Sequence, residues 1–345
     1  MKFIYSHEHR SHDPQQFMVR GQLKRSNEQP ERAEILLRSA QKAGHQPMLA
    51  EDFGPSPRAA VHTPEYLHFL QTAWQRWQAL PDASLEVLPN VFPFPGQPFT
   101  YPDHLVGQAG YHMGDCACSI GEHTWHAAIN SAHCATHAAE LVLQGEQAAY
   151  ALCRPPGHHA YVDRANGFCY LNNAAIAAQH LRSKHARVAV LDIDVHHGNG
   201  TQGIFWRRND VLTVSIHADP HFCTPFFTGH AHERGEGEGL GYNLNLPQPK
   251  GTTTDQYLRA LETALTTIRH YAPGALVLAL GLDAHEHDPY QALAIDTPGF
   301  ARITEKIAQL GLPTVIVQEG GYLSEDLGLN LESALRGFET GAGDR

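Results

Sequence analysis

The chain has 345 residues, and its 25 Lys and Arg against 36 Asp and Glu give a formal net charge of −11, with His taken as neutral. Hydrophobic residues make up 42% of the chain and charged residues 18%, which supplies a large core and excludes a disordered protein. The acidic balance argues against non-specific nucleic-acid binding, which needs a basic surface, so no nucleic-acid partner is expected. The chain also has 25 His, and their positions decide whether they bind metal.

The cysteines and the apolar stretches bear on where the protein works. None of the six Cys belongs to a C-x-x-C pair, and a disulfide framework is not expected in so long a chain. The N-terminus has no long apolar run typical of a signal peptide. The longest apolar stretch, residues 275–282, is far shorter than the ~20 residues that span a bilayer. We therefore expect a cytoplasmic protein without a membrane partner.

Short apolar runs alternate with helical patterns along most of the chain. In chain order, the predicted elements are a strand at 2–5, helices at 30–44, 64–80 and 124–143, a strand at 149–153, a helix at 172–184, strands at 187–193 and 211–216, a helix at 254–271, a strand at 275–282, a helix at 298–310 and a strand at 313–318. Most of these strands are continuously apolar, which is typical of parallel strands covered on both faces. The pattern predicts an α/β fold, a single domain over residues 1–345 with a central parallel sheet flanked by helices on both faces.

The segment 81–113 does not fit this alternation. It contains six prolines and the aromatic residues Phe92, Phe94, Phe99 and Tyr101. A loop of this length inside a compact domain is usually functional or part of an interface, and exposed aromatic side chains tend to be covered. We expect a long Pro-rich loop insertion with such a role, and an extended surface crossover is the plain alternative.

Polar residues follow five of the apolar strands. The segments that follow the strands are Arg154-Pro155-Pro156-Gly157-His158-His159, Asp192-Ile193-Asp194-Val195-His196-His197-Gly198-Asn199-Gly200, Ser215-Ile216-His217, Asp283-Ala284-His285 and Gln318-Glu319-Gly320-Gly321-Tyr322. Ligands of parallel α/β sheets bind beyond the carboxyl ends of the strands. The five segments therefore predict one site at one edge of the sheet.

Asp192, Asp194 and His196 point to a metal ion. They lie at i, i+2 and i+4, so on a strand they face the same way, and two carboxylates side by side in a buried place need a cation between them. Asp283 ends another strand and is a candidate third ligand. Oxygen and nitrogen ligands with an open fourth position suit catalytic Zn²⁺. The alternatives are turn-capping Asp residues with a surface His, and a helix N-cap at Asp283.

His158, His159 and Tyr322 are candidate catalytic residues. The stiff Pro155-Pro156 turn would hold both imidazoles near the metal. Neighbouring imidazoles cannot easily both be protonated, so one can act as a general base while the other holds charge. The phenol of Tyr322 can donate a hydrogen bond to a developing oxyanion. Taken alone, a His pair in a loop is more often structural, and a lone Tyr more often packs against the core.

Together these segments resemble the zinc-dependent histone deacetylase superfamily. The matching pieces are Arg154-Pro155-Pro156-Gly157-His158-His159, Asp192-x-Asp194-x-His196-His197-Gly198-x-Gly200, Gly281-x-Asp283-Ala284-His285 and Glu319-Gly320-Gly321-Tyr322, in the family order. Within the superfamily, the chain is most similar to the bacterial acetylpolyamine amidohydrolases in its length, its N-terminal strand and its Pro-rich segment. The resemblance implies an arginase/deacetylase-like fold over almost the whole chain.

The resemblance also implies residue roles. The zinc ligands would be Asp194, His196 and Asp283, the catalytic residues His158, His159 and Tyr322, and the residues that orient the two His would be Asp192 and Asn199. His159 would be the general base and would later protonate the leaving amine, while Tyr322 would stabilise the oxyanion. Some relatives carry Asp where this chain has Asn199, so His159 should be less basic here.

A substrate channel and two monovalent-cation sites are implied as well. Phe168 and Phe227 would form the channel walls, and the Gly167 carbonyl would accept a hydrogen bond from the scissile amide. A first K⁺ site would use Asp192, Asp194, His196, Ser215 and Ile216, and a second would use Phe205, Arg208, Val211 and Tyr242. Polyamine-specific relatives often have an acidic residue before a Gly-x-x-Gly-Tyr step. Here Val106 stands at that position, and nearby Asp103 would substitute for the acidic residue.

The function implied is a zinc-dependent amidohydrolase that removes acetyl groups from acetylated polyamines, as a homodimer whose 81–113 loop narrows the entrance. An alternative substrate is acetyl-lysine in proteins or peptides. A more remote alternative is a binuclear Mn²⁺ ureohydrolase, suggested by Asp283-Ala284-His285-Glu286-His287-Asp288, and another is a zinc-bound module without activity.

Overall fold

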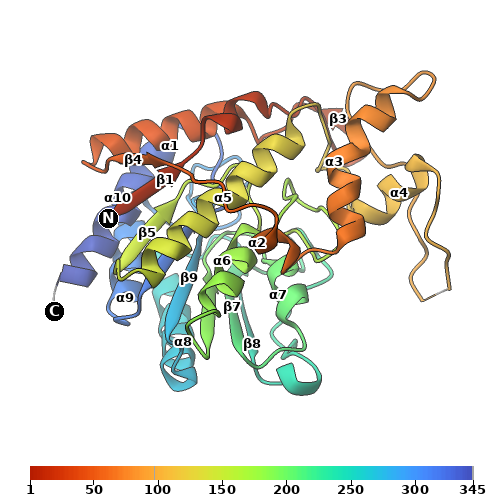
Figure 1. Ribbon diagram of the computed structural model, residues 1–345. Coiled ribbons are helices and arrows are strands. Elements are labelled where there is room, and N and C mark those ends of the chain that lie inside the picture. Colours follow the sequence, from red (N-terminus) through yellow and green to blue (C-terminus); the bar gives the residue numbers. More distant parts are fainter. Residues whose placement is uncertain (97, 344–345) are drawn as a thin grey trace.

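A computed structural model describes residues 1–96 and 98–343; residue 97, inside the predicted loop, and residues 344–345, at the end of the predicted domain, lie outside the described residues. Eight parallel strands form the centre of the molecule (Figure 1). In spatial order they are β4 (Pro47–Leu49), β1 (Lys2–Tyr5), β5 (Ala148–Ala151), β10 (Thr314–Gln318), β9 (Ala275–Leu280), β6 (Val188–Asp192), β7 (Val211–Ala218) and β8 (Asn243–Gln248). The predicted parallel sheet is confirmed.

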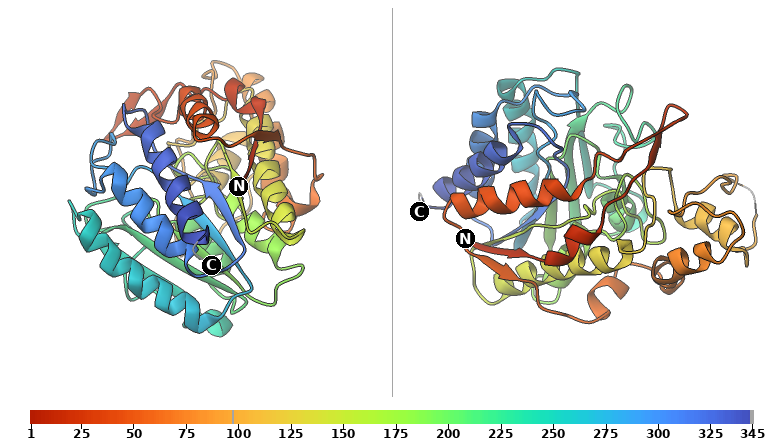
Figure 2. Two further views of the ribbon diagram at one scale, coloured as in Figure 1. Left: turned by 90° about the vertical axis from the view of Figure 1, so that its left-hand side faces the viewer. Right: turned by 90° about the horizontal axis from the view of Figure 1, so that it is seen from above.

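Helices cover both faces of this sheet (Figure 2). One face carries α1 (Pro30–Lys42), α8 (Thr254–Tyr271), α9 (Thr297–Ala308) and α10 (Leu327–Gly343), and the other carries α5 (Thr124–Leu143) and α6 (Asn173–Leu181). Side chains alternate between the faces along each strand: Leu191 joins the first core, while Val190 joins the second. This explains why the strands are apolar throughout, and it confirms the predicted α/β fold with two helical layers.

A third apolar cluster lies beside the sheet, around α3 (Pro64–Gln78) and α4 (Leu105–His112). The expectation of a loop throughout 81–113 is wrong for eight residues near its end, Leu105–His112, which form α4. Leu105 and Ala109 are buried against this cluster, and His104 caps the helix by accepting the Val106 N–H. Burial of one face and a capped start therefore turn the end of the Pro-rich segment into a helix.

Several short elements complete the chain. They are the 3-10 helices His7–Ser11 and Gly237–Gly239, the hairpin β2 (Phe17–Val19) and β3 (Gln22–Lys24), α2 (Ser56–Ala59) and α7 (Asn199–Phe205). No helix among the described residues has the length and hydropathy needed to cross a membrane.

Candidate active site

The carboxyl ends of four neighbouring strands bring the predicted residues together. The order β5-β10-β9-β6 places the segments that follow these strands at one edge of the sheet. They carry His158 and His159 after β5, Tyr322 after β10, Asp283 after β9, and Asp192, Asp194 and His196 at and beyond the end of β6. All seven side chains are buried.

Asp194, His196 and Asp283 form a group whose atoms can hold one metal ion. The Nδ1 atom of His196 lies 3.2 Å from Oδ1 of Asp194 and 3.3 Å from Oδ2 of Asp283. Tetrahedral zinc with bonds of 2.0–2.1 Å separates its ligand atoms by about 3.4 Å. Oδ2 of Asp283 is buried without a hydrogen-bond partner, which is costly for a carboxylate unless a cation binds it. The spacing, the donor types and the unpaired oxygen all fit Zn²⁺.

Backbone N–H groups hold the remaining oxygens of these carboxylates. Asp194 accepts from Gly320 N–H at 2.7 Å through Oδ2, and Asp283 accepts from Val195 N–H at 3.0 Å through Oδ1. A Cβ atom at Gly320 would lie 2.1 Å from the free Oδ2 of Asp283, so only glycine fits there. Burial and the charge of Asp194 raise the pKa of Asp283, as expected where two carboxyl groups face one another.

The two neighbouring imidazoles have different partners. Nδ1 of His158 lies 2.9 Å from Oδ2 of Asp192, whereas Nδ1 of His159 lies 2.6 Å from the amide Oδ1 of Asn199. Burial opposes the charged form of His158, but the carboxylates of Asp192 and Asp194 outweigh it and raise its pKa to about 10. Burial and the charges of His158 and His196 lower the pKa of His159. His159 is therefore neutral, with Nδ1–H bonded to Asn199 and the lone pair of Nε2 free to accept a proton.

Tyr322 belongs to the segment after β10, and its phenol is protonated. Burial raises its pKa well above the usual value, so it is a hydrogen-bond donor at neutral pH. Its backbone N–H donates to Oδ2 of Asp288 at 2.9 Å. Its ring lies 5.9 Å from Phe168 and 5.1 Å from Tyr290.

Of the predicted channel residues, Gly167 and Phe168 contact His159 and Tyr322, and Phe227 lies at the surface. Gly167 has φ +52°, its N–H donates to Asp115, and a Cβ there would lie 2.4 Å from His159. Phe168 is buried between Tyr322 and Phe17 of the β2–β3 hairpin, at 5.6 Å from the latter ring. Phe227, by contrast, is 88% exposed, so its side chain does not form a packed wall.

Asp103 also lies apart from the buried group. It is exposed just before α4, and α4 lies at the periphery of the molecule, away from the sheet (Figures 1 and 2). The structure therefore does not bring this carboxylate to the metal ligands within one chain.

The residues expected to bind monovalent cations lie on adjoining elements. Asp192 of β6 is in register with Ser215 of β7, and the Ile216 carbonyl accepts the Tyr257 O–H at 3.2 Å. Near the start of β7, the Phe205 carbonyl accepts the Arg208 N–H at 2.9 Å, and the Tyr242 carbonyl accepts from Thr213. Val211 is the first residue of β7.

Arg32 is part of the site, although no pattern in the sequence predicts this role. It lies in α1, where it reads as one charged residue of an ordinary amphipathic helix. In the structure it is buried; its Nε donates to the Gly321 carbonyl at 2.5 Å and its Nη2 to the Glu319 carbonyl at 2.8 Å. Its guanidinium lies 4.8 Å from the ring of Tyr322. Arg32 therefore positions the segment that carries the phenol, a contact across 289 residues of chain.

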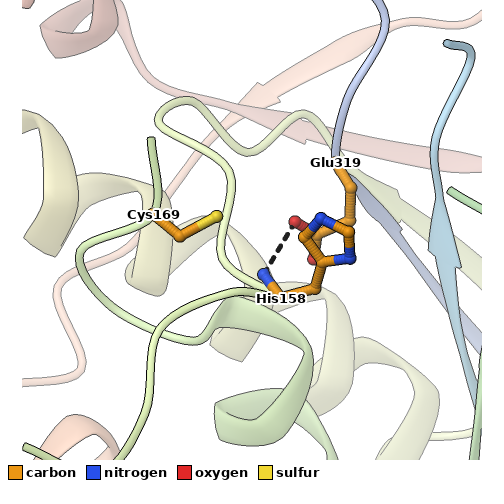
Figure 3. Close-up of side chains that lie close together, drawn as sticks. All are labelled: His158, Cys169 and Glu319. Atoms are coloured by element: carbon orange, nitrogen blue, oxygen red, sulfur yellow. Dashed lines mark hydrogen bonds between the residues drawn. The ribbon is translucent and has the colours of Figure 1, made fainter. Parts of the chain in front are cut away.

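Glu319 supports the other catalytic segment (Figure 3). Its Oε2 accepts the backbone N–H groups of Gly157 at 2.7 Å and His158 at 3.0 Å. The sulfur of Cys169 points toward this pair, and burial raises the pKa of Glu319 to about 7. His158, Cys169 and Glu319 also lie close enough to bind a metal, but the bonds of Glu319 indicate a role in holding the His158 backbone.

Tyr290 is a second residue without a sequence signal. Its ring lies 4.8 Å from His196, edge to face, so it packs between a metal ligand and Tyr322. It follows Asp288-Pro289 in a stretch that has no regular pattern, and only the fold brings it to the site.

Comparisons with known proteins agree with this geometry. A model of the histone deacetylase domain matches residues 26–338. The acetylpolyamine amidohydrolase of Burkholderia pseudomallei (strain 1710b) is 50% identical over 331 residues, 95% of each chain. Acetylpolyamine amidohydrolase 1 of Pseudomonas aeruginosa is 44% identical over 99% of this chain and 100% of its own. A crystal structure of the acetylpolyamine aminohydrolase from B. pseudomallei superposes with a TM-score of 0.95 at 48% identity, covering 98% of both chains.

Proposed function

Because this chain belongs to the histone deacetylase domain family, we propose that it is a zinc-dependent amidohydrolase that removes acetyl groups from acetylated polyamines. The observation that carries the chemistry is the buried metal-binding group at the edge of the sheet that also carries a neutral imidazole, His159, and a protonated phenol, Tyr322. The substrate class rests on the names of the relatives that match over nearly the full chain.

Asp194, His196 and Asp283 would hold one zinc ion per chain. When bound, zinc supplies a Lewis acid that polarises the acetyl carbonyl and makes water more acidic. K⁺ at the two sites named above would neutralise carbonyl and carboxylate oxygens, and the register of Asp192 with Ser215 supports the site nearer to the zinc ligands.

The protein's own residues would move the protons. Nε2 of His159 would take a proton from the water as its oxygen bonds to the acetyl carbon. His159 would then give this proton to the nitrogen as the C–N bond breaks, releasing acetate and a free amine. His158 would hold its positive charge against Asp192 throughout, and the phenol of Tyr322 would donate a hydrogen bond to the carbonyl oxygen as it becomes negative.

The flat face of Phe168 would hold the alkyl chain of the substrate, and the Gly167 carbonyl would accept the amide N–H. The 81–113 segment would close the entrance in a homodimer. Phe94 is 79% and Phe99 58% exposed, and large apolar side chains of this kind are usually covered by a partner. Asp103, on the same segment, would then reach the entrance of the neighbouring subunit and attract the ammonium group. Free thiols at all six Cys support a reducing, cytoplasmic location.

The test is a set of initial rates of acetate release from acetylputrescine, acetylcadaverine, acetylspermidine and an acetyl-lysine peptide, measured side by side on zinc-loaded protein. We expect the small acetylated diamines to be the fastest substrates. Faster turnover of the peptide would assign the protein to acetyl-lysine instead. The Asp283→Asn variant is the control, because it removes a metal ligand and should abolish release from every substrate.

Metal content separates the remaining alternatives. One zinc ion per active chain is expected after removal of loosely bound metal. Two Mn²⁺ ions per active chain would instead indicate a ureohydrolase, and one zinc ion without acetate release from any substrate would indicate a binding module.

A further inference from the structure

A second cluster of metal-binding side chains lies outside the catalytic group, and we propose that it binds a divalent transition-metal ion such as Zn²⁺. It consists of His285, His287 and Asp326, each of which offers a ligand atom within 4.8 Å of the others. The two His belong to the Asp283-to-Asp288 element, in which the proposed deacetylation uses Asp283 directly and Asp288 as a support for Tyr322. This second site supplies no group to the proposed reaction.

His285 is held in the tautomer that a metal ion needs. Its side chain is 3% exposed, and its Nε2 lies 3.3 Å from Oγ1 of Thr297. That hydroxyl donates its own hydrogen to Oδ1 of Asn330 at 2.6 Å, so it accepts from Nε2–H of His285. Nδ1 therefore carries a lone pair. Fixing one ring nitrogen by a hydrogen bond so that the other can ligate is the usual arrangement around metal-binding histidines.

The free Nδ1 atom of His285 faces the other two ligands. Oδ2 of Asp326 lies 3.9 Å from this Nδ1 and 2.9 Å from Nδ1 of His287. One of these distances is longer and the other shorter than the distance of about 3.4 Å expected between two ligand atoms of tetrahedral zinc. The backbone N–H of His287 reaches Nδ1 of His285 at 3.3 Å, a long hydrogen bond that a metal ion can replace.

Binding requires little rearrangement. The proton shared between His287 and Asp326 would leave as the metal binds, and the side chain of His287 is 67% exposed and free to adjust. Two imidazoles and one carboxylate with water as a fourth ligand suit Zn²⁺ or Co²⁺ better than Ca²⁺ or Mg²⁺, which prefer oxygen ligands.

The second metal site lies between the segment of the zinc ligand Asp283 and the segment of Tyr322. His285 and His287 lie just after the zinc ligand Asp283, and Asp326 lies just after Tyr322. The bond from Tyr322 N–H to Asp288 already joins these two segments once. A metal ion at the second site would join them again at the surface, and it would hold the phenol in place relative to the metal ligand.

The test compares zinc stoichiometry in matched variants of the full chain. Wild type, His287→Ala, Asp326→Asn and His180→Ala are dialysed against micromolar free Zn²⁺, and bound zinc is counted by elemental analysis. His180 is the matched control, since its Nε2 lies 2.9 Å from a carboxylate oxygen of Glu140 but no third ligand completes a metal group there among the described residues.

We expect the His287→Ala and Asp326→Asn variants to bind one zinc ion fewer per chain than wild type and His180→Ala. The melting temperature of wild type should rise with added zinc beyond one equivalent, and that of His287→Ala should not. Equal zinc counts in wild type and His287→Ala would overturn the proposal. The readout does not depend on acetate release, so a failure of the proposed deacetylation would be seen separately.

Discussion

His158 and His159 are adjacent in the chain, yet their pKa values move in opposite directions. Burial opposes the charged form of both imidazoles, but the carboxylates of Asp192 and Asp194 outweigh it at His158. At His159 the charges of His158 and His196 add to the effect of burial, and the neutral Asn199 brings no charge to oppose them. The proton acceptor His159 therefore has a lowered pKa beside a neighbour whose pKa is raised. Two identical side chains acquire separate roles through the charges around them.

Replacing Asn199 by Asp should make His159 more basic. The added negative charge beside Nδ1 favours the imidazolium, so the pKa of His159 should rise. Since a general base works only when unprotonated, the rising limb of kcat/KM against pH should move to higher pH. A pH–rate profile on the best acetylated diamine checks this, with Asn199→Ala as the control that removes orientation without adding charge. A limb that moves to lower pH would contradict the assignment.

The phenol of Tyr322 should affect the turnover rate and not the binding of zinc. Tyr322→Phe keeps the ring that contacts Phe168 and Tyr290 but removes the donor to the oxyanion. We expect kcat to fall at least about tenfold, or about 1.4 kcal/mol of transition-state stabilisation, with zinc content unchanged.

Tyr290→Phe is the matched control for this loss, because it removes the hydroxyl of the neighbouring tyrosine and keeps the ring that contacts His196 and Tyr322. It should retain most of the activity. Near-normal turnover in Tyr322→Phe would reject the role assigned to the phenol.

At the scale of elements, the sequence predicts the inner strands well and the two edge strands poorly. The strands at 2–5 and 313–318 agree with β1 and β10 to within one residue, because strands buried on both faces are continuously apolar. β8 escapes prediction since it lies at the sheet edge and alternates Asn243-Leu244-Asn245-Leu246. β4, at the other edge, has three residues, too few for any periodicity.

The same contrast holds for the site. The metal group and the His pair could be predicted because each lies directly beyond an apolar strand. Arg32 and Tyr290 could not be predicted, because their roles depend on which distant segments the fold places beside them.

The helix α10 could not be predicted either, because Gly328, Gly337 and Gly341 obscure its helical pattern. Glycine is needed at 337 and 341, since a Cβ atom there would come within 2.3 Å of the α9 backbone.

The helix α10 should contribute strongly to stability through its buried face. Leu331 is fully buried in the core shared with α1 and the sheet, so Leu331→Ala should lower the free energy of unfolding by about 2–5 kcal/mol. Leu329, in the same helix, is 47% exposed. Leu329→Ala should therefore change the free energy of unfolding by less than about 0.5 kcal/mol. Denaturant unfolding of both variants measures the contrast, and equal losses would mean that α10 is not packed as described.

At the scale of the whole molecule, a buried ionic cluster joins the two ends of the chain at the site. Oε1 of Glu28 accepts from Arg32 at 2.5 Å and from Arg154 at 2.8 Å, and all three side chains are buried. Arg154 also binds the carbonyls of His9 and His12, while Arg32 binds the segment before Tyr322. The N-terminal segment, the His158 loop and the phenol segment are therefore positioned by one network.

Removal of the metal should destabilise the whole molecule. The ligands come from the ends of two central strands, and a metal that binds the folded but not the unfolded chain stabilises it by mass action. A chelator should therefore lower the melting temperature of wild type by several degrees, reversibly on adding Zn²⁺. The Asp283→Asn variant should melt at the same temperature with and without the chelator, and a wild type insensitive to the chelator would contradict a structural contribution from the metal.

The order of the strands in the sheet determines when, during synthesis of the chain, the metal site can form. β9 lies between β6 and β10 in space, but it is made long after β6. A nascent chain that has emerged only to residue 274 can pair β6 with β7, yet it lacks Asp283, Tyr322 and the strand that fills the middle of the sheet. Such a chain has a gap where the metal belongs, so the ion is acquired late on the ribosome or after release, and an interrupted synthesis product holds no working site.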